Sequence, residues 1–316
     1  MDDRPAEPRG AWGAFWYTPE PAVNLAVARI LLAGTALWIV LSRHDLPSIV
    51  AFAPELWSHV SWWTRLRFFL LWEVGVERML FGVLHVTLAA ALLGFWPRLA
   101  CAVSGLLLYH FAPLESIVWS PNPYLRGLTI PALGLLILSF SRSAEALSLL
   151  PRGAPDAVAP SAEFRWPLRL VQVLMCQIYF FSGWAKLVTS GPAWLTAENI
   201  RGWLLLIDQS VVGEPSFGTV LAGYPLVCAA MAWAGMGLDL AFPLVLFFPG
   251  ARWVLVPLAF VFHAASSMFF RIFFQNAGLL LLFVNWKAVL AVVESRRGTW
   301  WRPSLEPRLR RPRTPD

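Results

Sequence analysis

Lysine is almost absent from this sequence. Only Lys186 and Lys287 are lysines among the 25 basic residues, and the remaining basic side chains are arginines. Arginine stays protonated in proteins, whereas a lysine removed from water can lose its proton and act as a base. Lys186 ends an otherwise apolar segment, where a lysine can also extend its ammonium group to the membrane surface. Position alone therefore leaves two interpretations open, a base and a snorkelling anchor.

Charged residues and cysteines are also scarce. Charged residues make up 14% of the chain, hydrophobic residues make up 58%, and the mean hydropathy is +0.59. These values are typical of a polytopic membrane protein without a large soluble domain. Cys101, Cys176 and Cys228 are odd in number and lie in apolar runs, so we expect neither a disulfide framework nor a redox motif. No spacing of His, Cys and carboxylate residues indicates a metal site, and we expect none.

Apolar segments long enough to cross a membrane occupy most of the chain. A span needs about 20 apolar residues, and the sequence predicts about eight spans, within a range of seven to nine. The sixth is longer than required, so we expect it to be tilted or broken near Pro225 or Pro243. The mixed segment 42–77 predicts interfacial helices. The predicted fold is all-α, a polytopic integral membrane helical bundle. The expected spans are 22–41, 79–95, 99–114, 126–141, a segment that opens with Pro167 and ends at 191–192, 222–248, 253–270 and 275–293.

The positions of the basic residues predict the orientation of the chain. Arginines are concentrated in residues 294–316, and basic segments beside a membrane face the cytosol. An even number of spans then gives a multi-pass protein of the cell membrane with both termini cytosolic. Residues 1–21 form a cytosolic and interfacial N-terminus, residues 22–293 the transmembrane domain, and residues 294–316 a basic tail. The net charge of +6 reports topology and contact with the lipid bilayer, so nucleic acid is not an expected partner.

Arg29 and Lys186 are basic residues within spans, and each calls for a partner. Arg29, in the first span, should face other helices or snorkel, because an arginine at the bilayer centre costs about 2.5–3.5 kcal/mol. Lys186 falls in the outer half of the membrane below the polar segment 188–218, with Glu198 and Asp239 as candidate counter-ions and His263 as a further polar group.

The residues that precede Lys186 form a semi-polar stripe. Offsets of three and four place them on one face of a helix, and Gly183 leaves space for another backbone or for a flat ligand. Close packing of helices through small residues explains the same pattern without any function. The members of the stripe are Gln172, Cys176, Tyr179, Gly183 and Lys186.

Three segments of the chain, in the order in which they occur along it, resemble those of a known family. The first is residues 179–187, YFFSGWAKL, followed by Trp194. The others are Trp119 with Tyr124, Leu125 and Gly127, and the helix of Asp239 followed by Phe262 and His263. This ordered set resembles the HTTM (horizontally transferred transmembrane) domain family and the membrane core of vitamin K-dependent gamma-carboxylase. The similarity covers most of residues 20–293.

The resemblance implies a chemistry. It implies that Lys186 acts as a base toward a reduced quinone similar to vitamin K hydroquinone, with His263 in a supporting pocket role. A lysine made neutral by burial could accept a phenolic proton from a lipid-soluble quinol that enters sideways from the bilayer. With the stripe and the candidate counter-ion, the resemblance gives a cofactor site that contains Asn122, Tyr179, Gly183, Trp194 and Asp239.

Two departures from the carboxylase pattern narrow this expectation. Asn122 stands where the carboxylase has a functional histidine, and asparagine cannot relay a proton. The chain also ends soon after its last span, so we expect no large lumenal domain to grip a protein substrate. We expect a carboxylase-like, quinol-dependent membrane enzyme acting on a peptide or small molecule, rather than carboxylation of a protein glutamate. Two other classes remain open: a non-catalytic maturation, export or immunity partner, and a transporter.

Overall fold

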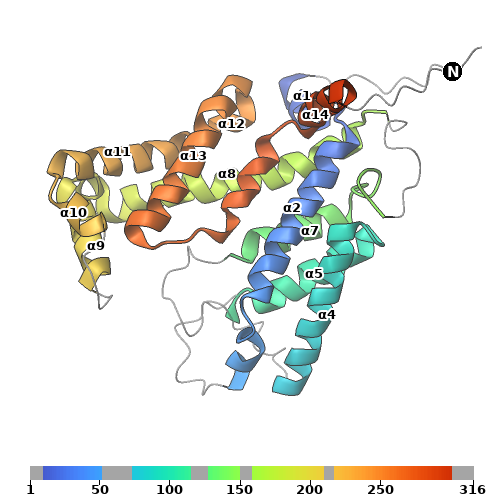
Figure 1. Ribbon diagram of the computed structural model, residues 1–316, viewed down its shortest axis with the longest axis horizontal. Helices are drawn as coiled ribbons and strands as arrows, with labels where there is room; N and C mark the ends of the chain where they lie inside the picture. The colour runs from blue at the N-terminus through green and yellow to red at the C-terminus, as the bar shows by residue number, and fades with distance from the viewer. Residues whose placement is uncertain (1–9, 52–72, 115–126, 150–158, 210–216, 301–316) are drawn as a thin grey trace, which may run out of the picture. The chain divides into compact units, whose positions relative to one another are not determined.

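Every regular element that the structure describes is helical. The computed structural model describes residues 10–51, 73–114, 127–149, 159–209 and 217–300 (Figure 1). Within these ranges one isolated antiparallel bridge joins Glu20 to Ser161. The predicted all-α class is confirmed for this part of the chain. The elements are α1 (Gly10–Tyr17), α2 (Ala22–Leu41), η1 (Leu46–Ala51), α4 (Val74–Leu93), α5 (Pro97–Phe111), α7 (Thr129–Ser139), α8 (Ala162–Ser190), η5 (Gly191–Leu195), α9 (Ala197–Gln209), α10 (Phe217–Ala222), α11 (Pro225–Ala241), α12 (Leu244–Phe247), α13 (Pro249–Phe270), η6 (Gln275–Phe283) and α14 (Trp286–Trp300).

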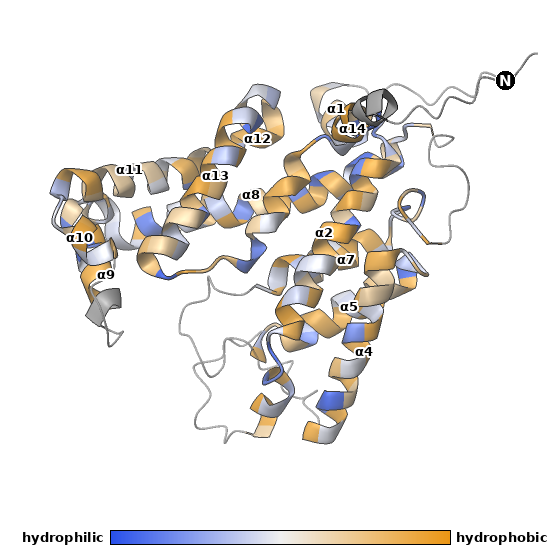
Figure 2. Cartoon of the chain, in the orientation of Figure 1, coloured by the Kyte–Doolittle hydropathy of each residue, from blue (hydrophilic) through white to orange (hydrophobic). Residues whose placement is uncertain are grey.

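Four helical segments are long and apolar enough to cross a membrane. They are α2, α4, the segment Ala162–Leu195 formed by α8 and η5, and α13. A fifth results if the consecutive segments Gln275–Phe283 and Trp286–Ser295 form one broken span. Apolar residues predominate along α2, α4 and α5 (Figure 2). The predicted count of about eight spans is not confirmed.

Local sequence explains where the helices depart from the predicted spans. Proline has no amide hydrogen and clashes with the preceding helical turn, and the predicted span 222–248 divides at Pro243 into α11 and α12. The predicted span 275–293 starts as the 3₁₀ helix η6. Helix α8 starts before Pro167, because the Ser161 hydroxyl caps it by accepting a hydrogen bond from the Glu163 amide at 3.2 Å. Pro167 therefore lies inside α8 and does not open it.

The chain divides into two compact units, residues 1–284 and 285–316, and α14 is the described helix of the second. In the first unit, α2, α4, α5 and α7 pack on one another, and α8 packs on α2, α7 and α11. The main apolar core lies among these helices, while a smaller cluster, with Leu204 and Cys228 at its centre, lies between α9, α10 and α11. Helix α8 thus carries Lys186 and contacts both groups of helices.

Arg29 of α2 is completely buried. Of the two expected arrangements, it therefore faces the protein interior and does not snorkel. Its guanidinium donates hydrogen bonds to the Ser143 carbonyl at 2.7 Å, the Leu147 carbonyl at 2.6 Å and the Ser148 hydroxyl at 3.0 Å. These acceptors all belong to the segment that follows α7. Arg29 therefore fastens that segment to α2.

Candidate functional site

Lys186 forms an ion pair with Asp239. The ammonium nitrogen of Lys186, near the end of α8, lies 2.5 Å from Oδ2 of Asp239 on α11. The Asp239 side chain is 4% exposed and that of Lys186 is 21% exposed, so the carboxylate is enclosed while the amine remains accessible. Of the two predicted counter-ions, Asp239 is therefore the partner. Sequence reasoning missed Ser182, whose side chain also hydrogen-bonds Asp239.

The ion pair requires close contact between α8 and α11, and Gly183 permits it. A Cβ atom added to Gly183 would lie 2.9 Å from the Cβ of Asp239 and 3.0 Å from a methyl group of Leu240. The space beside Gly183 is thus filled by α11. The sequence predicted either another backbone or a flat ligand beside Gly183, and the structure places helix α11 there.

Replacing Gly183 by alanine is expected to lower stability by about 1–3 kcal/mol, because the added methyl group would force α8 away from α11. Gly237→Ala is the matched control, since Gly237 lies in α11 and a Cβ there would meet nothing within 4 Å. That substitution should be neutral or should stabilise the helix by roughly 0.5–1 kcal/mol. Thermal unfolding in detergent compares the two variants, and equal melting temperatures would contradict close packing at Gly183.

The Trp194 ring lies beside the ammonium group of Lys186. Helix α8 ends at Ser190, and the next residue, Gly191, has a φ of +56°, a conformation that favours glycine. The short helix η5, which contains Trp194, follows directly. The Lys186 ammonium nitrogen lies 5.4 Å from the centroid of the Trp194 ring, within the range of a cation–π interaction. Trp194, which follows the segment 179–187 in sequence, therefore lies beside Lys186 in space.

Tyr179 and His263 form a second polar pair. The Tyr179 hydroxyl oxygen lies 2.5 Å from Nε2 of His263 on α13, and the tyrosine ring stacks on Phe242 with centroids 4.0 Å apart. If the hydroxyl donates this hydrogen bond, the neutral imidazole carries its proton on Nδ1. That Nδ1 is buried and has no hydrogen-bond partner in the described part of the chain. His263 thus retains a polar atom that a ligand could bind.

The remaining members of the stripe have a structural role. Gln172 donates a hydrogen bond to the Leu282 carbonyl at 2.7 Å and accepts one from Arg169 at 3.1 Å. The Cys176 thiol is buried and free. Asn122, the predicted cofactor residue in the proline-containing loop, lies outside the described residues. The structure therefore brings six predicted residues together around two pairs: Tyr179, Gly183, Lys186, Trp194, Asp239 and His263.

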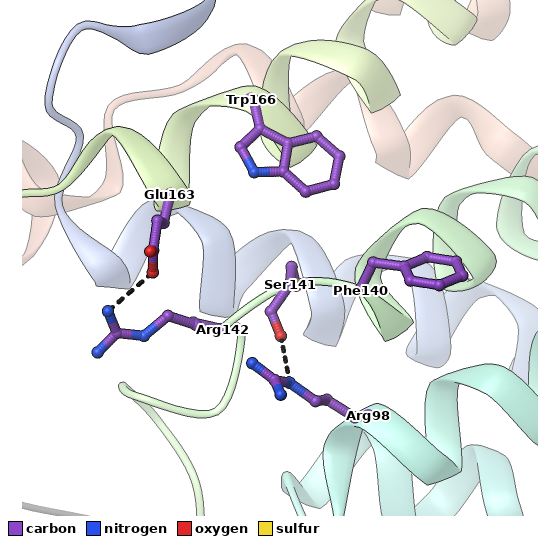
Figure 3. Close-up of a pocket in the computed structure, with 6 residues that line it drawn as sticks. All are labelled: Arg98, Phe140, Ser141, Arg142, Glu163 and Trp166. Carbon is purple, nitrogen blue, oxygen red and sulfur yellow. Dashed lines mark hydrogen bonds and ion pairs between the residues drawn. The ribbon is translucent and has the colours of Figure 1, made fainter.

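A polar cavity of about 220 Å³ lies at the other end of α8 (Figure 3). It is lined by Arg98, Phe140, Ser141, Arg142, Glu163 and Trp166. At 1.5 Å per helical residue, Glu163 is roughly 35 Å along the helix from Lys186. This cavity is therefore separate from the lysine site. Within the described ranges, no group of three or more His, Cys, Asp and Glu residues could hold a metal ion.

A comparison with protein families matches the HTTM domain model to residues 17–285. The match contains both polar pairs and ends just before α14. No solved structure matches the chain. With the apolar helices, the match indicates a membrane protein, and it confirms the resemblance inferred from residues 179–187 and the two other segments.

Proposed function

The chain belongs to the HTTM domain family, and from this premise we propose that it is a multi-pass cell-membrane enzyme that uses Lys186 as a base. The substrate would be a quinol or another lipid-soluble molecule on the extracytoplasmic side, with both chain termini in the cytosol. The observation that carries the proposal is the ion pair of Lys186 and Asp239 inside an apolar helical bundle. Buried ion pairs contribute little net stability, and ionisable residues inside membrane helices commonly mark reaction or transport sites.

The pair provides a way to hold and release one proton. Lys186 and Asp239 have no net charge either as ammonium and carboxylate or as amine and carboxylic acid. The Lys186 Nζ and Asp239 Oδ2 atoms are 2.5 Å apart, and transfer of the shared proton from Nζ to Oδ2 leaves Lys186 as a neutral amine. That amine could then accept a proton from a phenolic hydroxyl, which is the role of a general base. Arginine cannot replace lysine in this step because its guanidinium does not release a proton at physiological pH.

Three described residues support the proposal of a reduced quinone similar to vitamin K hydroquinone as the ligand. Lys186 would contact its hydroxyl group, Trp194 would cover its ring, and the unpartnered Nδ1 of His263 would hydrogen-bond a second oxygen. When bound and oxygenated, such a quinol would supply a strong base, as the resemblance to the carboxylase implies. Tyr179 would hold the His263 ring in place through its hydrogen bond. A peptide or a small molecule would be the second substrate, on which this base acts.

The test supplies purified protein in lipid nanodiscs with reduced naphthoquinone and oxygen and measures quinone epoxide. The proposal predicts epoxide formation that depends on Lys186. Epoxide yields equal to those from empty nanodiscs would remove the support for the cofactor and for the enzyme class together.

A non-catalytic membrane protein is the second candidate, and one observation favours it. The ion pair fastens α8 to α11 beside Gly183, so Lys186 can have a purely structural role. In that case Lys186→Arg should preserve every cellular function of the protein, because arginine can also pair with Asp239.

A further inference from the structure

Three arginines gather around one glutamate near the amino-terminal end of α8. Arg165 and Arg169 lie one turn apart on α8, Arg252 lies in the first turn of α13, and Glu20 precedes α2. Arg169 interacts electrostatically with both other arginines, and Arg252 interacts with Glu20. Arg169 is only 9% exposed, and the side chains of Arg165 and Glu20 are 16% and 19% exposed. The four charges therefore form one largely enclosed cluster, called the arginine cluster below.

The arginine cluster has an excess of two positive charges. Arg165 pairs with Glu20 at 3.0 Å, which is the cluster's one ion pair in the described part of the chain. Arg169 donates to the neutral Gln172 side chain at 3.1 Å and the Leu246 carbonyl at 3.4 Å, and Arg252 donates to the Val245 carbonyl at 2.8 Å. Buried charges without a counter-charge are costly, so Arg169 and Arg252 favour an external anion.

Arg142, at the same end of α8, shows the contrasting arrangement. It hydrogen-bonds Glu163 at 2.8 Å and also pairs with Glu145. The hydrogen bonds to Glu163 and Glu145 raise the pKa of the Arg142 guanidinium above its usual value. Its charge is therefore matched by carboxylates of the protein, unlike the charges of Arg169 and Arg252.

Aromatic residues surround the arginine cluster as they do at a membrane–water interface. The Arg169 guanidinium lies 5.0 Å from the centroid of the Phe15 ring in α1, and that ring stacks on Phe247. Trp12 of α1 is 75% exposed and Trp253, next to Arg252, is 85% exposed. Tryptophan is enriched at the headgroup level of a bilayer. An anion that reaches the cluster would therefore come from the headgroup layer.

We propose that Arg169 and Arg252, supported by Arg165, bind the phosphate group of an anionic phospholipid. Guanidinium groups bind phosphate oxygens with paired hydrogen bonds, and basic sites between membrane helices on the cytoplasmic side bind lipid headgroups. Only the choice of the cytoplasmic leaflet depends on the proposed orientation of the chain. The binding itself does not depend on any activity of Lys186, since at 1.5 Å per residue Arg169 is roughly 25 Å along α8 from that residue.

The test measures lipid binding to the full-length protein in detergent by native mass spectrometry. The probes are phosphatidylglycerol, phosphatidylcholine and inorganic phosphate. The unsubstituted protein should retain phosphatidylglycerol in preference to phosphatidylcholine. Arg252→Gln and Arg169→Gln should each weaken this binding about fivefold, because each removes one positive charge near the phosphate. Arg252→Lys should retain most of the preference, and it shows whether charge is the cause.

Arg142→Gln is the matched control and should leave phosphatidylglycerol binding unchanged, because its charge is already neutralised by carboxylates. Arg252 is only partly buried, so its variants test the proposal even if Arg169→Gln fails to fold. Equal loss in Arg142→Gln, or no preference for phosphatidylglycerol in the unsubstituted protein, would overturn the proposal. Displacement of the lipid by inorganic phosphate at equal concentration would overturn the assignment to a lipid.

Discussion

Lys186→Arg is expected to lower quinone epoxide formation by about 10²–10⁴-fold, the usual contribution of a general base. Arginine preserves the positive charge and can pair with Asp239, so the contact between α8 and α11 should remain intact. It does not release its proton and so cannot accept another one. The rate of epoxide formation per mole of folded protein in nanodiscs measures the effect, and the melting temperature should change little.

Lys287→Arg is the control for this prediction, because it changes the other lysine of the chain in the same way. Its rate should equal that of the unsubstituted protein. If Lys186→Arg retains full activity, the proton acceptor is another group, and the second candidate, a structural role for Lys186, becomes the better one. If both variants lose activity equally, the loss does not come from removal of a base.

The sequence predicted α2 at its observed bounds, 22–41, and the break at Pro243, because both depend on local properties. A continuous apolar run gives the length of a span, and a proline weakens a helix by removing a hydrogen bond, although α8 continues through Pro167. The total count of spans was harder to predict. Residues 275–283 are as apolar as a transmembrane helix but form the 3₁₀ helix η6. Hydropathy does not distinguish a 3₁₀ helix from an α-helix.

Sequence reasoning named six of the residues that the structure brings together, but it did not predict which acidic residue pairs with Lys186. Helical spacing placed Tyr179, Gly183 and Lys186 on one face, as the structure has them. The choice between Asp239 and Glu198 as counter-ion depends on which helix packs against Gly183. The sequence of α8 alone does not specify which helix that is. The arginine cluster was missed for the same reason, because Arg252 and Glu20 are far from Arg169 in sequence.

Arg29 gives the prediction with the largest expected effect on stability. Arg29→Met preserves an unbranched side chain but leaves two carbonyl groups and the Ser148 hydroxyl without their donor. Hydrogen bonds from a charged group contribute about 1.5–3 kcal/mol each, and relief from burying the charge offsets part of their loss. We expect the free energy of unfolding to fall by about 2–4 kcal/mol. The melting temperature in detergent should then fall by roughly 5–10 °C.

Arg98→Met is the comparison that isolates burial. Arg98 is exposed and donates to one carbonyl, that of Ser141, at 3.1 Å, so its replacement should change stability by less than about 1 kcal/mol. Arg29→Met should also increase proteolysis after α7, because Ser143 and Leu147 would lose their attachment to α2. A melting temperature within the error of the unsubstituted protein, with unchanged proteolysis, would show that Arg29 does not fasten this segment. Because the prediction depends only on the buried contacts of α2, it can be tested before any substrate is known.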